Sequence, residues 1–294
     1  MNNILVFTHL LNGALMVAIP VVLGIFLSRR FNLGWRLWWI GGATFILSQV
    51  GHIPFNILVG QLFNTGVLPA PPQQYTLLFQ SIFLGLSAGF WEEGARYAAY
   101  RWWAKDARSW SRGLMMGAGH GGIEAIVLGI LVLVTYIAMI AIRNMDLSSL
   151  VPPEQLALAQ TQVSAYWSAA WYDTLLGALE RSFSITVQLA LSILVLQVFT
   201  RRRHYWLWIA IGWHTLVDAV AVYSAATLGI YVTELIIAVF ALASLAFIFL
   251  LRQPEPEQIV ELEPVPIQAP DSTILSGQVF PTVTDEKLDE SRFQ

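Results

Sequence analysis

The chain has 294 residues, of which 56% are hydrophobic and 12% are charged, and its mean hydropathy is +0.61. Soluble domains carry about 25% charged residues, so this composition excludes a soluble globular protein and indicates several membrane helices. The chain has no cysteines, which excludes disulfides, thiolate metal ligands and a cysteine nucleophile. Its 12 tryptophans are typical of aromatic belts at the two membrane surfaces.

Hydropathy predicts an all-α fold, a polytopic transmembrane bundle of about seven helices. A membrane core about 30 Å thick needs roughly 20 apolar residues per helix. The predicted spans are residues 4–28, 37–60, 75–100, 112–141, 170–199, 205–225 and 228–251. The third and fifth spans are the most polar. The loop of residues 142–169 is expected to hold a short amphipathic helix along the membrane surface.

Basic residues gather in alternate loops. These residues are Arg29, Arg30, Arg36, Arg101, Lys105, Arg108, Arg112, Arg201, Arg202, Arg203 and Arg252. The remaining loops carry only Arg143. The positive-inside rule therefore predicts that the N-terminus lies outside and the C-terminus in the cytoplasm. The arginine runs are explained by topology, and nothing in the sequence indicates a nucleic-acid partner.

The composition changes after Arg252. The segment 253–294 contains nine acidic residues and repeated prolines, a pattern typical of disorder. We therefore expect two parts, a transmembrane domain over residues 1–252 and an acidic, Pro-rich cytoplasmic tail over residues 253–294.

Residues 87–103 place three charges inside an otherwise apolar span. Glu92 and Glu93 stand four and three residues before Arg96, so all three can share one face of a helix. Charges at membrane depth are costly and usually serve a function. Arg96 can pair with one carboxylate and leave the other available for proton chemistry. The alternative is an ion pair that only stabilises the helix near the interface.

Two further spans bring a histidine and an acid to the same depth. His120 and Glu124 lie in the fourth span, and His214 and Asp218 in the sixth, each pair four residues apart on one helix face. Counting from the cytoplasmic ends at 1.5 Å per residue places them, with Glu92 and Glu93, about 10–20 Å deep. The sequence therefore predicts a shared polar chamber, against the alternative of separately satisfied buried imidazoles.

Glu180 and Arg181 lie in the fifth span and allow two interpretations. Glu180 can act as a structural brace with Arg96 or Arg181, or it can supply one more carboxylate to the site.

At these motifs the chain resembles the YhfC family of intramembrane proteases. That family is related to PrsW and, more distantly, to the CAAX-prenyl-protease and bacteriocin-processing superfamily. The resemblance is carried by Glu92-Glu93-Gly94-Ala95-Arg96, Gly119-His120-Gly121-Gly122-Ile123-Glu124-Ala125, Glu180-Arg181 and His214-Thr215-Leu216-Val217-Asp218. It covers most of the membrane part and none of the tail.

The chain departs from the prenyl-protease pattern in three places. Two residues, instead of three, separate the glutamate pair from Arg96, as in the PrsW-like form. In the second motif, His120 falls where that pattern has Phe, and Glu124 where it has His. Asp218 replaces an Asn in the last motif. These departures leave the role of each second-motif residue open.

The resemblance implies an intramembrane endopeptidase whose water enters from the cytoplasmic side. Glu92 or Glu93 would be the general base, tuned by Arg96, with His120 or Glu124 orienting the water. His214 and Asp218 would stabilise the oxyanion or protonate the leaving amine. In a zinc version, His120, His214 and Glu93 would be ligands with one position left for water. The implied partners are the lipid bilayer and a membrane-embedded peptide or protein substrate.

Two other classes of function remain open from the sequence. A proton- or ion-coupled transporter also uses buried carboxylates and histidines, although it would predict inverted repeats and broken helices. A non-catalytic membrane receptor or immunity-type protein could keep the fold without the chemistry.

Overall fold

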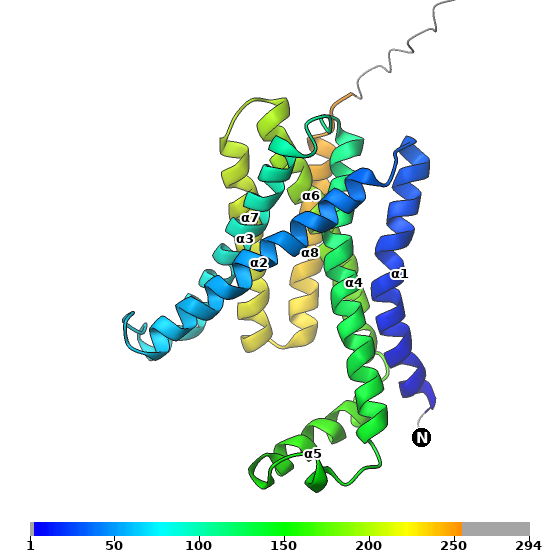
Figure 1. Ribbon diagram of the computed structural model, residues 1–294, viewed down its shortest axis with the longest axis vertical. Coiled ribbons are helices and arrows are strands. Elements are labelled where there is room, and N and C mark those ends of the chain that lie inside the picture. Colours follow the sequence, from blue (N-terminus) through cyan, green and yellow to red (C-terminus); the bar gives the residue numbers. More distant parts are fainter. Residues whose placement is uncertain (1–2, 255–294) are drawn as a thin grey trace, which may run out of the picture. The chain divides into compact units, whose positions relative to one another are not determined.

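A computed structural model of the chain describes residues 3–254, and all of their regular structure is helical (Figure 1). The long helices are α1 (Asn3–Phe31), α2 (Arg36–Asn64), α3 (Thr76–Trp102), α4 (Trp110–Ile142), α6 (Leu176–Thr200), α7 (Tyr205–Thr227) and α8 (Ile230–Leu250). The shorter α5 (Pro153–Ser168) confirms the helix expected in the loop 142–169. Single-turn helices η1 (Gln73–Tyr75), η2 (Leu147–Ser149) and η3 (Asp173–Leu175) lie in the connections.

The all-helical membrane fold predicted from the sequence is confirmed, and each predicted span corresponds to one long helix. Within the described residues, six stretches are long and apolar enough to cross a membrane: α1, α2, α4, Asp173–Thr200, α7 and α8. The exception is α3, whose Glu92, Glu93 and Arg96 lower its hydropathy. Its 27 residues would still extend about 40 Å. The seventh span and the orientation of the termini stay predictions, as does the domain boundary after Arg252. The predicted tail lies outside the described residues from residue 255 onward.

Helix α6 lies at the centre of the bundle. Residues 190–198 of α6 are all buried, and α6 packs against α4, α7 and α8. Helix α4 also packs against α1 and α2, while α3 packs against α2 and α7. A mostly apolar stretch of helix, interrupted here only by Ser192 and Gln197, suits a position surrounded by other helices. This arrangement surrounds the polar residues of α3, α4 and α7 with protein.

Two glycines let α2 and α4 approach closely. A Cβ atom added to Gly119 would lie 1.9 Å from the backbone oxygen of Trp38, and one added to Gly41 would lie 2.0 Å from that of Met116. Small residues at helix contacts are a common way to bring membrane helices together. This contact sets the distance between Thr44 on α2 and His120 on α4.

We expect Gly119→Ala to lower the stability of the protein by about 1–3 kcal/mol, because the added methyl group forces α2 away from α4. Gly212→Ala is the matched control, since no atom lies within 4 Å of the Cβ position at Gly212. Thermal unfolding of both variants in detergent checks this expectation. Equal unfolding temperatures for the two variants would contradict the close contact.

Candidate active site

Two histidine rings face one carboxylate inside the bundle. The Nε2 atom of His120 on α4 lies 3.0 Å from Glu92 Oε2 on α3. The Nε2 atom of His214 on α7 lies 3.9 Å from the same oxygen. All three residues are buried. The structure therefore brings together residues that the sequence places at one depth on three separate helices.

Thr44 fixes the orientation of the His120 ring. The Thr44 hydroxyl donates to the backbone oxygen of Gly41 at 2.5 Å, and its oxygen lies 2.8 Å from His120 Nδ1. Because a hydroxyl has only one proton, the second contact requires His120 Nδ1–H to be the donor. A neutral His120 then presents the lone pair of Nε2 to Glu92.

Glu93, paired with Arg96, fixes the orientation of the His214 ring. Arg96 donates to one oxygen of Glu93 and, at 2.5 Å, to Gln188 Oε1 on α6. The other oxygen of Glu93 lies 2.8 Å from His214 Nδ1, so this nitrogen is the donor. The side chains of Glu93 and Arg96 are fully buried. His214 is therefore held with its Nε2 atom toward Glu92.

This arrangement leaves two ring nitrogens and a carboxylate oxygen, all acceptors, facing one another. A shared proton or a cation would satisfy them. Histidines that bind a metal usually donate their other N–H to a carboxylate or a similar acceptor, as both rings do here. Imidazole nitrogens with a carboxylate oxygen are also a donor set that zinc prefers.

The two imidazole nitrogens and the Glu92 carboxylate are of the chemical types that bind zinc, but their positions are not those of zinc ligands. No three His, Asp or Glu side chains within residues 3–254 are arranged to hold a metal ion as they lie. Glu92 Oε2 and His120 Nε2 lie 3.0 Å apart, a distance at which a shared proton joins them, so a zinc ion would have to replace that proton. Glu93 is less suited to be a ligand than the sequence suggested, because Arg96 and His214 Nδ1 already occupy its two oxygens.

The remaining predicted residues surround this centre. Asp218 Oδ2 lies 3.5 Å from His214 Nε2, and the Asp218 side chain is 40% exposed. Glu124 does not contact the histidines in the hydrogen-bond network. It accepts from Arg181 at 2.7 Å, and Arg181 also pairs with Glu180. Arg181 thus connects two acids at the edge of the site, which agrees with the interpretation of Glu180 as a brace.

Three polar residues that the sequence did not single out complete the network: Thr44, Gln49 and Gln188. Gln188 donates to Glu124 at 3.1 Å and to Glu92 at 3.4 Å, while Gln49 donates to Glu92 at 3.1 Å. Gln188 follows Arg181 by two helical turns, and this spacing could have identified Gln188 from the sequence. Thr44 could not have been identified in this way, because a lone threonine in a membrane helix usually hydrogen-bonds to its own backbone.

Within residues 3–254, buried side chains fill the region where the sequence predicts an opening toward the basic loops. Between the site and the basic ends of four helices lie Tyr100 on α3, Met116 on α4, Leu194 on α6 and Ala210 on α7, each at most 1% exposed. They belong to one apolar core cluster. Buried side chains on all four helices, those of Tyr100, Met116 and Leu194 being large, therefore fill this side of the site.

Comparison with known proteins agrees with the geometry. The sequence profile of the family described as YhfC intramembrane metalloprotease matches residues 15–241, a range that includes every predicted site residue. Over 223 residues the chain is 30% identical to a Bacillus subtilis (strain 168) protein described as uncharacterized membrane protein YhfC, an alignment that covers 72% of this chain and 82% of that relative. No solved structure matches the chain. The chain is therefore an integral membrane protein that belongs to the YhfC family of intramembrane metalloproteases.

Proposed function

We propose that this protein is an intramembrane endopeptidase and that Glu92, His120 and His214 form its catalytic centre. The observation that carries the proposal is the convergence of both Nε2 atoms on Glu92, with each ring held through Nδ1 by a separate partner. Histidine rings whose orientation is fixed through Nδ1 are typical of catalytic or metal-binding sites. Two histidines that were only buried would have no reason to direct their Nε2 atoms at the same carboxylate.

In this proposal Glu92 is the general base. It takes a proton from the water that attacks the scissile carbonyl carbon, and the oxygen–carbon bond forms as the proton moves. Glu92 then passes this proton to Nε2 of His214, 3.9 Å away. The ring, held by Glu93, becomes cationic and delivers the proton to the leaving amine as the carbon–nitrogen bond breaks. Asp218 Oδ2, 3.5 Å from the same nitrogen, stabilises the charged ring. The products are a carboxylic acid and an amine.

The family description adds a metal to this account. His120, His214 and Glu92 would hold a zinc ion, with Thr44 and Glu93 fixing the two rings. Zinc bound there would polarise the scissile carbonyl and provide an activated water. Asp218, 3.5 Å from His214 Nε2 and 40% exposed, would then be the carboxylate left free to act as the base in place of Glu92.

The continuity of the helices favours a protease over the transporter that the sequence left open. Transporter sites near the membrane midplane are typically formed by broken helices whose ends point at the substrate. In the described part of the chain, α3, α4, α6 and α7 run without interruption past the site residues. The charged groups are therefore contributed by side chains on intact helices.

Comparison of membrane-protein fragments in cells tests this function. Cells that make the wild-type protein should contain fragments cut within or beside a transmembrane segment. These fragments should be absent with the double variant His120→Ala/His214→Ala, which removes both rings. Normal amounts of the double variant in the membrane are the control for folding. The same set of fragments in both strains would contradict the proposal.

Zinc content tests the metal part separately. The purified wild-type protein is expected to carry about one zinc ion per chain, the double variant none, and a chelator should stop cleavage until zinc is returned. Cleavage that survives the chelator in a zinc-free protein would contradict the metal version and leave Glu92 as the base.

A further inference from the structure

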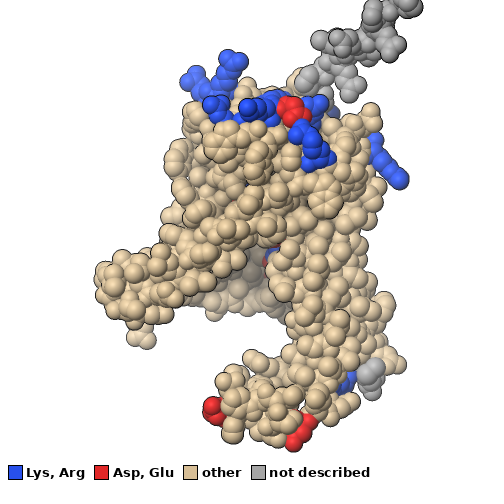
Figure 2. Space-filling view, in the orientation of Figure 1, with Lys and Arg blue, Asp and Glu red and all other residues tan. Residues whose placement is uncertain are grey.

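Two cavities lead away from the site on the side opposite the basic loops. The inner cavity, about 120 Å³, has Glu92, His214 and Asp218 in its wall. The outer cavity, about 580 Å³, runs along α1, α4 and α6 toward α5 and has His9 and Tyr166 near its far end. Figure 2 shows that the basic residues gather at the other end of the protein, over the connections that carry Arg29–Arg36 and Arg201–Arg203.

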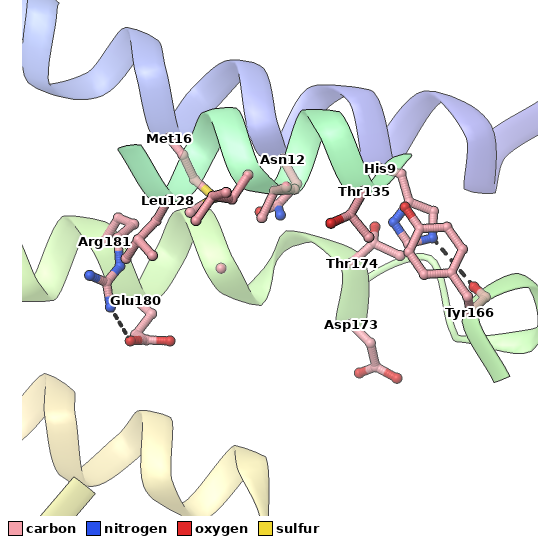
Figure 3. A pocket seen from close by; sticks show the side chains of 13 residues that line it. His9, Asn12, Met16, Leu128, Thr135, Tyr166, Asp173, Thr174, Glu180 and Arg181 are labelled. Carbon is pink, nitrogen blue, oxygen red and sulfur yellow. Dashed lines mark hydrogen bonds and ion pairs between the residues drawn. The ribbon is translucent and has the colours of Figure 1, made fainter. Parts of the chain in front are cut away.

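The outer cavity has polar side chains in its wall beside the apolar Met16, Leu128, Leu131 and Val132. Polar side chains follow one another along it: His9, Asn12, Thr135, Asp173, Thr174, Glu180 and Arg181 (Figure 3). Polar groups at membrane depth need a protein partner or water. The Asn12 amide oxygen accepts from the backbone N–H of Ala178 at 2.8 Å. Water in the cavity would hydrate the polar groups in its wall.

Arg181 lies where the two cavities meet. Arg181 and Glu180 belong to the walls of both cavities. Arg181 donates to Glu124 at 2.7 Å, and Gln188 reaches both Glu124 and Glu92. A continuous line of polar groups therefore runs from the outer cavity to the carboxylate in the proposed catalytic centre, and the Arg181 ion pairs are part of it.

We propose that water reaches Glu92 through this passage and that substrate approaches the site from the same face, the one that carries α5. By the positive-inside rule this face lies outside the cytoplasm. The inference rests on the proposed function and narrows its substrate class to membrane proteins whose scissile bond lies in the outer half of the bilayer. A bond on the cytoplasmic side, as in a prenylated cytoplasmic C-terminus, would have to cross the apolar core around Tyr100 and Met116.

The absence of cysteines makes the route directly measurable. We would place single cysteines at Thr135 in the outer cavity, at Ser184 in the inner cavity, and at Ser192, a fully buried control on α6 two turns toward the basic end. Each is tested with a membrane-impermeant thiol reagent, in intact spheroplasts and in inside-out vesicles. Lys105→Cys and Ser149→Cys, in connections at opposite ends of the bundle, report the orientation.

The expected pattern is labelling of Thr135→Cys, Ser184→Cys and Ser149→Cys only in spheroplasts, of Lys105→Cys only in inside-out vesicles, and of Ser192→Cys in neither. The inference would be overturned if Ser184→Cys were labelled only in inside-out vesicles, or if Ser192→Cys were labelled at all. It would also be overturned if Lys105→Cys were labelled only in spheroplasts and Ser149→Cys only in inside-out vesicles.

The labelling experiment needs no substrate, so it tests the passage independently of the proposed function. The expected labelling without any cleavage products would support the passage and contradict the proposed function. If the cells do contain fragments, their cut sites should lie in the outer half of the spanning segments. Cut sites in the cytoplasmic half would overturn the substrate class.

Discussion

Glu92→Gln is expected to lower the rate of substrate cleavage by about 10²–10⁴-fold, the usual contribution of a general acid–base group. The amide has the size of the carboxylate, and its oxygen can still accept from Gln49. Its N–H can donate to the Nε2 lone pair of His120, so the fold should be kept. What is lost is the charge and the ability to take a proton. The rate is measured on a substrate found by fragment comparison.

Glu234→Gln is the matched control for this variant. Glu234 is a buried glutamate on α8, 6% exposed, and makes no hydrogen bond to the proposed catalytic centre. The same change in charge at similar burial should leave the rate near that of the wild type. Comparable loss in both variants would mean that the effect of Glu92→Gln is a general consequence of altered charge in the membrane domain.

Arg96→Met is expected to give the largest loss of stability, about 3–5 kcal/mol, because it leaves Glu93 as a buried carboxylate without its cation. Both side chains are fully buried, and Gln188 Oε1 loses its donor as well. Replacing both members of a buried ion pair usually costs much less than removing one. The double variant Glu93→Gln/Arg96→Met should therefore recover much of the loss in a detergent unfolding experiment.

An exposed ion pair provides the comparison for Arg96. Arg36 contacts Asp106 at 2.5 Å, but both side chains are 54% exposed. Exposed pairs contribute at most about 1 kcal/mol, so Arg36→Met should change stability little. A single Arg96→Met variant as stable as Arg36→Met, or a double variant no better than the single one, would show that Glu93 does not depend on Arg96.

Much of the site was predictable because helical spacing is regular. The four-residue separation in His120/Glu124 and His214/Asp218, with a count of residues from each basic loop, was enough to place acids and imidazoles at one depth. The same regularity, together with hydropathy, predicted each long helix, including the polar α3. These inferences depend only on distances along a single helix, which follow directly from the number of residues between two positions.

The contacts between helices were not predictable in the same way. Whether Glu92 or Glu93 faces both histidines depends on the rotation of α3 against α7, and this rotation is set by packing. Thr44 comes from α2, which carries none of the motifs, whereas Gln188 lies two turns beyond the Glu180-Arg181 motif on α6. The sequence predicts access from the cytoplasmic side because charges in loops report topology. The passage proposed above depends instead on bulky residues such as Tyr100, which fill the basic end of the bundle.

The most direct test of the central claim is hydrolysis by the purified protein in lipid nanodiscs with water enriched in heavy oxygen. If Glu92 directs water onto a peptide bond, each new C-terminal carboxylate formed by the wild-type protein should contain heavy oxygen, and Glu92→Gln should form almost no product. Product without heavy oxygen, or labelled product formed by Glu92→Gln at the wild-type rate, would contradict the account.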